Sequence, residues 1–462
     1  MINNIFSMQD EIKKNTVSAE YYDQDYVKDY DFDKNNKINT ILLKSTMGTG
    51  KTKSLKNIIN KYKYKKIVII SFRVTLDKEY TRKFPEFELY SDIKDTVYDT
   101  NVHNKMVIQI DSFYRIQGNI DLLILDEFTY TAMHLIERVK HKETVYSALL
   151  EYINNYNTKL IVMDALLDLN TIKYFYNLNR RIHYIYNKFK KHTDLITYNY
   201  CNKVGVFVDT LLEYITNGKK IIIPTNSKNF LDNLEYKIKT KIPNIKCLFL
   251  NADTSDDINL ENWNNYDIVG YTPTIVAGIS FEKIHFDKCF GYFVNNSSPA
   301  EMSLQQLFRV RNLTDKEIHI CTEKKDNIVY PISVEEIEKN IIDRNTCMVD
   351  GVLGIKISRI NKTIKRDSYY YLYRDSQIKI FRSKNNYEEV LMKLLKNQGI
   401  HIKNVYKKDE ESDKQLRKDI KETSTKCKEG VIKDIILAEE IDDEEYYLMK
   451  DKTNLSYIEK NR

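Results

Sequence analysis

Residues 45–52, "STMGTGKT", have the composition and spacing of a loop that binds the phosphates of a nucleotide. Small residues let successive backbone N–H groups point at one anion, and the positive end of a following helix adds to their effect. The residues whose backbone N–H groups would bind the phosphates are Gly48, Thr49 and Gly50. An apolar run before the loop and an amphipathic pattern after it predict the strand and the helix that such a loop connects.

The next two residues have side chains suited to binding phosphate and Mg²⁺. Lys51 would reach the β- and γ-phosphates, and the Thr52 hydroxyl would be a ligand of Mg²⁺. The loop departs from the strict motif at Ser45, where a glycine is usual. The alternative is a glycine turn followed by an exposed lysine.

A second motif, "LLILDEFT" at 122–129, supplies the acids that nucleotide hydrolysis needs. Four apolar residues predict a central strand, and an acidic pair follows at its carboxyl end, where ligands bind in open α/β sheets. Asp126 would hold Mg²⁺, and Glu127 would orient and deprotonate the attacking water. The alternative is a solvated acidic pair after a core strand.

A third segment, "SLQQLFRVRN" at 303–312, combines an amphipathic pattern with Gln305, Arg309 and Arg311. Arginine suits developing phosphoryl charge because its planar fork donates two hydrogen bonds at once. We expect these arginines to complete a nucleotide site when two domains close on it. A surface helix with solvated basic residues is the alternative.

The motifs lie in a chain whose apolar runs alternate with helical patterns, as is typical of α/β domains with parallel sheets. The first domain has predicted strands at 40–44, 66–72, 106–111, 121–127, 159–165 and 181–187. After a basic connector at 188–194, the second has predicted strands at 219–225, 245–252, 266–272, 288–295 and 317–323. We place the two domains at 38–190 and 191–325.

The two ends of the chain are less patterned. Residues 1–37 are polar and rich in Tyr and Asp, so we expect a loosely ordered lead-in. We expect residues 326–462 to form an accessory region that tunes the core or binds a partner, and a fragment ending near 325 to keep ATPase activity. Within that region, 403–428 is dense in charge of both signs and predicts a solvated helix or a flexible segment.

Composition limits the class of protein. The net charge of +6 is too small, beside 72 basic and 66 acidic residues, to indicate a nucleic-acid partner by itself. No apolar run approaches the length of a membrane span, and the first residues lack a secretory pattern. Six cysteines without a close pair are typical of a reducing compartment. We therefore expect an intracellular protein without a membrane partner, in the nucleus or at a cytoplasmic viral replication site.

The ordered motifs resemble a superfamily 2 helicase core and, more narrowly, the viral origin-of-replication-binding protein family with its DEFT-type acidic motif. The resemblance covers about residues 38–325. Besides the three segments above, it rests on "ISFRVTLDKE" (70–79), "VIQIDSFYRI" (107–116), "IVMDALLD" (161–168), "IIIPTNSKNF" (221–230) and "YTPTIVAGISFE" (271–282). It implies an α/β fold of two tandem RecA-like parallel-sheet domains with a C-terminal mixed or helical extension, and ATP and Mg²⁺ as cofactors.

The resemblance also implies roles for single residues. Gln305 and Arg309 would contact the γ-phosphate, while Gly278 would contact both ATP and nucleic acid. Asp164 would couple the ATP state to domain closure. Arg311 lies two residues after Arg309, where the broader pattern has a spacing of three, so its role stays open.

A further set of residues matches motifs that follow the backbone of a single strand. These are Ser71, Phe72, Arg73, Gln109, Ser112 and Thr225. We also expect aromatic rings such as Phe72 and Phe113 to stack on bases without regard to sequence.

Together these features predict an ATP- and Mg²⁺-dependent DNA helicase or translocase that serves viral-type genome replication. One alternative is an RNA-remodelling ATPase on the same core, because the motifs contain no identifiable reader of the 2′-hydroxyl. Another is a nucleic-acid-binding module that has lost hydrolysis. The expected partners are single-stranded or duplex DNA, with RNA left open, and replication proteins that bind the C-terminal region.

Overall fold

The computed structural model describes residues 2–32, 37–62, 64–251, 260–273, 280–325, 327–347, 353–358 and 363–406, with single positions at 414, 418, 422 and 425. The chain divides into two compact units. Unit 1 contains Met1–Lys191 and Tyr330–Arg382, and unit 2 contains His192–Val329 and the described residues from Ser383 onward. Each unit is built on a parallel sheet, which confirms the predicted α/β class with two RecA-like domains.

The sheet of unit 1 has eight strands among the described residues, and all six strands predicted for this domain are present. In spatial order they are β1 (Ser18–Tyr22), β10 (Ile182–Asn187), β2 (Thr40–Ser45), β9 (Lys159–Asp164), β8 (Leu122–Asp126), β3 (Ile67–Ser71), β6 (Lys105–Gln109) and β4 (Glu88–Leu89). The central strands β3 and β8 are buried at every position. Such near-continuous apolar runs are required where helices cover both faces of a parallel sheet.

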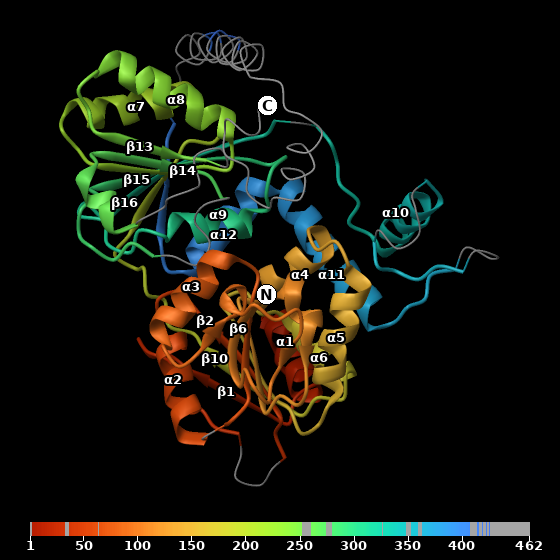
Figure 1. The fold of residues 1–462 in the computed structure, drawn as a ribbon. Helices are drawn as coiled ribbons and strands as arrows, with labels where there is room; N and C mark the ends of the chain where they lie inside the picture. Colours follow the sequence, from red (N-terminus) through yellow and green to blue (C-terminus); the bar gives the residue numbers. More distant parts are fainter. Residues whose placement is uncertain are drawn as a thin grey trace, which may run out of the picture. The chain divides into compact units, whose positions relative to one another are not determined.

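Helices lie on both sides of this sheet. Figure 1 shows α2 (Lys51–Tyr62) and α3 (Val74–Lys83) on one side, and α5 (Lys142–Asn154) and α6 (Leu169–Asn177) on the other. Across the sheet, the connection from β2 to β3 runs toward β4, whereas the connections from β8 through β9 to β10 run toward β1. Because parallel crossovers are right-handed, the two directions place their helices on opposite faces.

The strand register brings the predicted motifs together at the carboxyl ends of the strands. Lys44 of β2 pairs with Asp164 of β9, and Met163 pairs with Asp126 of β8. At the carboxyl ends of two further strands, Ser71 of β3 pairs with Gln109 of β6. The carboxyl ends of five neighbouring strands therefore meet where ligands bind in sheets of this class.

The expectation of a loosely ordered lead-in is wrong for residues 2–32. Helix α1 (Ile2–Lys14) is followed by β1, which pairs in parallel with β10 and forms the edge of the sheet. Tyr21 packs edge-on against Tyr184 at 6.1 Å between ring centroids. Tyrosine rings thus supply apolar surface for packing, although the segment as a whole has a polar composition.

The described C-terminal residues pack into both units, while the accessory role expected for 326–462 stays a prediction. In unit 1, Tyr369 of α11 (Ser368–Asn385) lies 4.8 Å from Tyr146 between ring centroids, and Arg366 binds Glu338 of α10 (Val334–Cys347). In unit 2, α12 (Tyr387–Asn397) packs on α9 (Ala300–Leu307), and β17 (His401–Asn404) pairs with β11 (Ile196–Asn199). A fragment ending near 325 would lose these contacts from both units, and this loss argues against its keeping ATPase activity. Most of the charged segment 403–428 lies outside the described residues.

The sheet of unit 2 has seven strands among the described residues, including all five that the sequence predicts. Their order is β13 (Cys247–Leu250), β14 (Ile268–Tyr271), β12 (Ile221–Pro224), β15 (Lys288–Val294), β16 (Glu317–Glu323), β11 and β17. The four-residue strands β11 and β17 at its edge were not predicted, because β11 carries alternate polar residues and β17 is largely exposed. Among the described helices, none is long and apolar enough to cross a bilayer.

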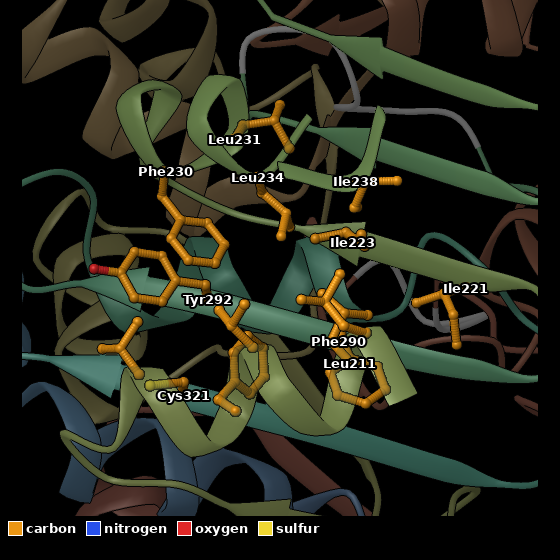
Figure 2. Packing of buried hydrophobic residues seen from close by; sticks show 14 of the residues in the cluster. Leu211, Ile221, Ile223, Phe230, Leu231, Leu234, Ile238, Phe290, Tyr292 and Cys321 are labelled. Atoms are coloured by element: carbon orange, nitrogen blue, oxygen red, sulfur yellow. The ribbon is translucent and has the colours of Figure 1, made fainter. Parts of the chain in front are cut away.

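One face of this sheet is covered by α7 (Val204–Thr216) and α8 (Lys228–Lys241). Figure 2 shows the core between them and the strands, where the ring of Phe230 stacks on Tyr292 at 3.8 Å between centroids. Leu211, Ile223, Leu234 and Phe290 belong to the same buried cluster. This core fixes the start of α8 against the carboxyl ends of β12 and β15.

Candidate functional site

The phosphate loop connects β2 to α2, as the sequence predicts. Gly48 and Gly50 have φ angles of 76° and 79°, in the left-handed region that glycine adopts without strain. The Thr49 hydroxyl oxygen lies 2.6 Å from Ser45 Oγ and 2.8 Å from the Thr46 carbonyl oxygen. Ser45, which departs from the strict motif, is buried and braces the loop from inside.

Lys51 begins α2 and points back into the loop. Its Nζ donates hydrogen bonds to the carbonyl oxygens of Ser45 at 3.0 Å and Thr46 at 3.2 Å. Bound phosphates would replace these carbonyls as partners of the ammonium group. Thr52 lies in the first turn of α2 and is half-buried, where its hydroxyl could serve a metal ion.

The N-terminal segment supplies two neighbours of this loop that the motif did not reveal. The Val27 amide donates to the Thr49 carbonyl oxygen at 2.9 Å. The ring of Tyr26, which is 58% exposed, lies so close to Gly50 that an added Cβ there would be 3.2 Å from Tyr26 Cδ1. Both residues come from outside the motif, so only the folded chain shows that they border the loop.

Asp126 ends β8 and is buried at the edge that carries the phosphate loop. Burial raises the pKa of its carboxyl group, while the Tyr80 hydrogen bond and the Lys51 ammonium group act in the opposite direction. The Tyr80 hydroxyl, on α3, donates to Asp126 Oδ2. Tyr80 is therefore a neighbour of the acid that the sequence motifs did not indicate.

Glu127 occupies the turn between β8 and α4 (Phe128–Glu137). Its φ and ψ angles are 48° and 49°, which is the left-handed conformation and costs a non-glycine residue about 1–2 kcal/mol. Its carbonyl oxygen accepts hydrogen bonds from the amides of Tyr130 and Thr131, both at 3.0 Å. Strain of this kind persists where the surroundings fix the backbone, which is common at functional sites.

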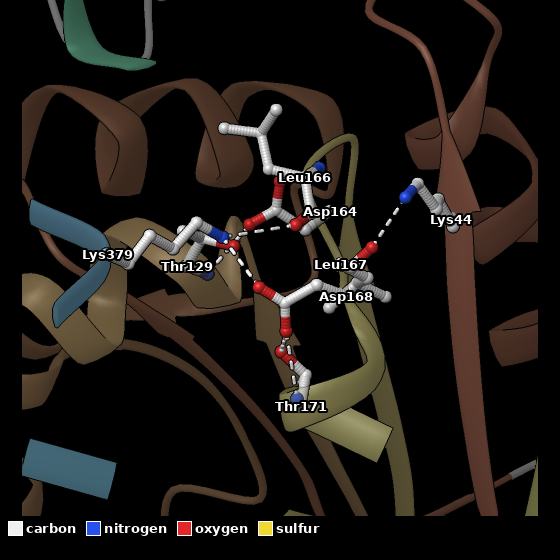
Figure 3. A network of polar contacts seen from close by, with 8 residues as sticks. All are labelled: Lys44, Thr129, Asp164, Leu166, Leu167, Asp168, Thr171 and Lys379. Atoms are coloured by element: carbon white, nitrogen blue, oxygen red, sulfur yellow. Dashed lines mark hydrogen bonds and ion pairs between the residues drawn. The ribbon is translucent and has the colours of Figure 1, made fainter. Parts of the chain in front are cut away.

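Asp164 ties two strand ends together. Its Oδ2 accepts a hydrogen bond from the Thr129 amide at 2.7 Å, and its Oδ1 accepts one from the Leu166 amide at 2.7 Å (Figure 3). The side chain is fully buried. The carboxylate thus links the end of β9 to the turn that carries Glu127, while its predicted role in coupling stays a prediction.

The residues predicted to follow a nucleic-acid backbone in unit 1 differ in accessibility. Arg73, Gln109 and Ser112 are half-buried and present part of each side chain to solvent. The Ser71 hydroxyl is fully buried and donates to Asp77 Oδ1 at 2.6 Å, so it supports the turn below Arg73. Burial raises the pKa of Asp77 to about 7, against a lowering by the Ser71 hydroxyl.

The prediction that Phe72 and Phe113 stack on bases is wrong in this structure. Phe72 is 2% exposed and stacks on Tyr130 at 5.7 Å between ring centroids. Phe113 is 0% exposed and packs edge-on against Tyr152 at 5.6 Å. Both rings lie beneath the polar residues of their motifs, where burial of apolar surface holds them.

In unit 2 the predicted amphipathic segment 303–312 is only partly helical. Gln305 is buried in α9, which ends at Leu307. Arg309 and Arg311 follow in an extended stretch, where the Phe281 amide donates to the Arg309 carbonyl at 2.8 Å and the Arg311 amide to the Phe281 carbonyl at 2.9 Å. Gly278 lies outside the described residues.

A pocket of about 550 Å³ lies at the carboxyl ends of β12 and β15, beside the first turn of α8. Thr225, which follows β12, is buried, and its hydroxyl accepts a hydrogen bond from the Ser227 amide at 3.1 Å. Its predicted contact with nucleic acid stays a prediction. The polar and basic residues that line the pocket include Asn226, Ser227, Lys228, Asn229, Asn233, Asn296, Ser297 and Lys325.

A phosphate loop after β2 and an acidic pair at the end of β8, with β9 between these strands, are the arrangement of a P-loop nucleotide-binding fold. The family model described as "Origin of replication binding protein" matches residues 7–229 and 190–333. The chain therefore belongs to the origin-of-replication-binding protein family, as the sequence motifs indicate.

Two viral proteins and one solved structure are among those similar to this chain. A putative helicase/primase complex protein of African swine fever virus (strain Badajoz 1971 Vero-adapted) is 29% identical over 76% of this chain and 34% of its own length. A putative replication origin-binding protein of Acanthamoeba polyphaga mimivirus is 30% identical over 62% of this chain and 38% of its own length. The solved structure of S. cerevisiae Dbp5 bound to RNA and ADP BeF3 is 10% identical, with a TM-score of 0.44 over 78% of this chain and 89% of that chain. The chain spans little more than a third of the length of these two viral relatives.

Proposed function

We propose that this protein is an ATP- and Mg²⁺-dependent DNA helicase or translocase that acts in viral genome replication. The observation that carries the proposal is that the phosphate loop and the acidic pair lie at the carboxyl ends of β2 and β8, two strands that both pair with β9. Membership in the origin-of-replication-binding protein family supports the nucleic-acid substrate and the replication role.

The site offers the donor types that Mg-ATP requires. The Thr52 hydroxyl and the Asp126 carboxylate are hard oxygen donors, which suit Mg²⁺. Bound Mg²⁺ would neutralise charge on the phosphates. Backbone amides of the loop and Lys51 would hold those phosphates, and Glu127 would accept the proton of the attacking water. In this proposal Gln305 and Arg309 of unit 2 complete the site when the two units close.

The two acids should differ when each is changed to its amide. Glu127→Gln keeps the shape of the side chain but removes the base, so we expect kcat for ATP to fall by about 10²- to 10⁴-fold while Mg-ATP still binds. Asp126→Asn should weaken the Mg²⁺-dependent part of nucleotide binding. Steady-state hydrolysis and a fluorescent-nucleotide titration, with and without Mg²⁺, measure both. Equal and mild effects at the two positions would indicate a solvated pair without a catalytic role.

The pocket of unit 2 is suited to a phosphodiester backbone. Lys228 and Lys325, which pair with Asp232 and Glu323, could turn to a phosphate, and the N-terminal turn of α8 adds amide groups that attract anions. Asparagine side chains around the pocket can donate to phosphate oxygens without reading base sequence. These contacts predict strand binding that weakens steeply with salt and has little dependence on sequence.

Stimulation of ATP hydrolysis by nucleic acid tests the proposed substrate. We expect single-stranded DNA to increase kcat, and we expect RNA of matched length to do so less. Stimulation by RNA alone would favour the RNA-remodelling ATPase. Strand binding without turnover would identify a module that has lost hydrolysis.

A further inference from the structure

The loop 165–168, which joins β9 to α6, is held by side chains from distant parts of unit 1 (Figure 3). Lys44 of β2 donates to the Leu167 carbonyl oxygen at 2.6 Å. Lys379 of α11 donates to the Leu166 carbonyl oxygen at 3.3 Å and pairs with Asp168 Oδ2 at 3.1 Å. The loop is thus fixed from the strand that leads into the phosphate loop and from a helix about 210 residues later in the chain.

Asp168 has a second set of contacts that fixes its carboxylate. As the N-cap of α6, its Oδ1 accepts hydrogen bonds from the amide and the hydroxyl of Thr171, both at 3.0 Å. Burial by itself raises the pKa of Asp168, but the Lys379 ammonium group and the Thr171 amide lower it overall. The ionised carboxylate therefore anchors Lys379 at the start of a helix.

Leu166 connects this anchor to the candidate catalytic turn. Its carbonyl oxygen accepts from Lys379, and its amide donates to Asp164. The other oxygen of the Asp164 carboxylate accepts from the amide of Thr129, two residues after Glu127. A continuous series of hydrogen bonds therefore runs from α11 to the turn that carries the proposed base.

We propose that Lys379 is a positioning residue for ATP hydrolysis, which holds loop 165–168 so that Asp164 fixes the turn of Glu127. This inference rests on the proposed ATPase function. It assigns a role to a helix outside the motif-bearing part of the chain, in the region that the sequence indicates only as accessory. A displaced loop would move Asp164 and tilt Glu127 relative to the attacking water, and small misplacements of catalytic groups lower rates strongly.

If the ion pair had a purely structural role, loss of Lys379 would lower the stability of the fold. The side chains of Lys379 and Asp168 are 25% and 40% exposed, and ion pairs with such access to water contribute little to stability. Loss of the lysine should therefore leave the fold intact. A matched control is available on α6, where Lys173 pairs with Glu11 at 2.8 Å and the two side chains are 42% and 36% exposed.

The experiment compares Lys379→Met, Lys379→Arg and Lys173→Met with the wild type in the full chain. It measures kcat and KM for ATP with saturating single-stranded DNA, and the midpoint of thermal unfolding. We expect Lys379→Met to lower kcat on the order of tenfold with KM within about twofold, because positioning affects the transition state more than ATP binding. Lys379→Arg should restore most of the rate, and Lys173→Met should behave as the wild type.

The outcomes separate this inference from the proposed function. An inactive wild type would contradict the proposed function and this inference with it. An active wild type whose kcat is unchanged in Lys379→Met would overturn only the positioning role. Equal losses in Lys379→Met and Lys173→Met, or a Lys379→Met chain that does not fold, would also overturn it, because the lysine would then act through stability alone.

Discussion

Lys51→Ala should reduce ATP turnover by at least about 10²- to 10³-fold, the scale of losing one preorganised donor to a developing negative charge. The substitution removes the ammonium group but keeps the turn, because Gly48 and Gly50 set the backbone of the loop. The fold should survive, since the contacts of Lys51 are to carbonyl oxygens within the loop and its surroundings stay packed. Phosphate release from ATP at saturating DNA measures the effect.

Lys56→Ala is the matched control for this change. Lys56 lies on the same helix, α2, and is exposed, so its loss should leave turnover near the wild-type rate. Turnover by Lys51→Ala at the wild-type rate would show that the loop is a glycine turn with a bystander lysine. An equal loss in both variants would point to a general effect of charge on the binding of anionic ligands.

Arg309→Ala should lower the maximal ATPase rate by about 10³-fold or more, as expected when an arginine finger is lost, with a smaller effect on ATP binding. The residue follows α9, and its backbone amide and carbonyl bond to Gln306 and Phe281, so its backbone position does not depend on its own side chain. Arg309→Lys should recover only part of the rate, because an ammonium group lacks the planar fork of the guanidinium. Single-turnover hydrolysis separates the chemical step from binding.

Arg311→Ala is the comparison that decides the register of this motif. The two arginines flank Val310, which pairs with Phe281. We expect a milder effect at 311 than at 309. Normal turnover in Arg309→Ala together with a collapse in Arg311→Ala would show that the second arginine is the finger.

The parts of the fold that sequence predicts are those set by local patterns. Strands such as β2 and β8 are largely apolar runs, and the loop at 45–52 and the acidic pair lie at their carboxyl ends, so their positions could be read along the chain. Strands β1 and β17 were missed because their pairing partners lie far away in sequence and their own residues are polar or exposed.

The supporting residues of the site were missed for the same reason. Tyr80 meets Asp126 across 46 positions, and Lys379 meets Asp168 across 211. No spacing within a motif indicates such contacts. Phe72 and Phe113 were misinterpreted because burial is a tertiary property, and an aromatic residue beside a polar motif has the same local pattern whether it faces solvent or the core.

Unwinding of a DNA duplex with a single-stranded tail tests the proposed helicase function most directly. The measurement follows strand release by the wild type and by Lys51→Ala, with ATP and Mg²⁺, without ATP, and with a non-hydrolysable ATP analogue. We predict release only by the wild type with ATP and Mg²⁺, because opening should require hydrolysis at the loop of residues 45–52. Release that is equal in Lys51→Ala, or that proceeds without hydrolysis, would contradict an ATP-driven helicase, as would a wild type that hydrolyses ATP yet separates only RNA duplexes.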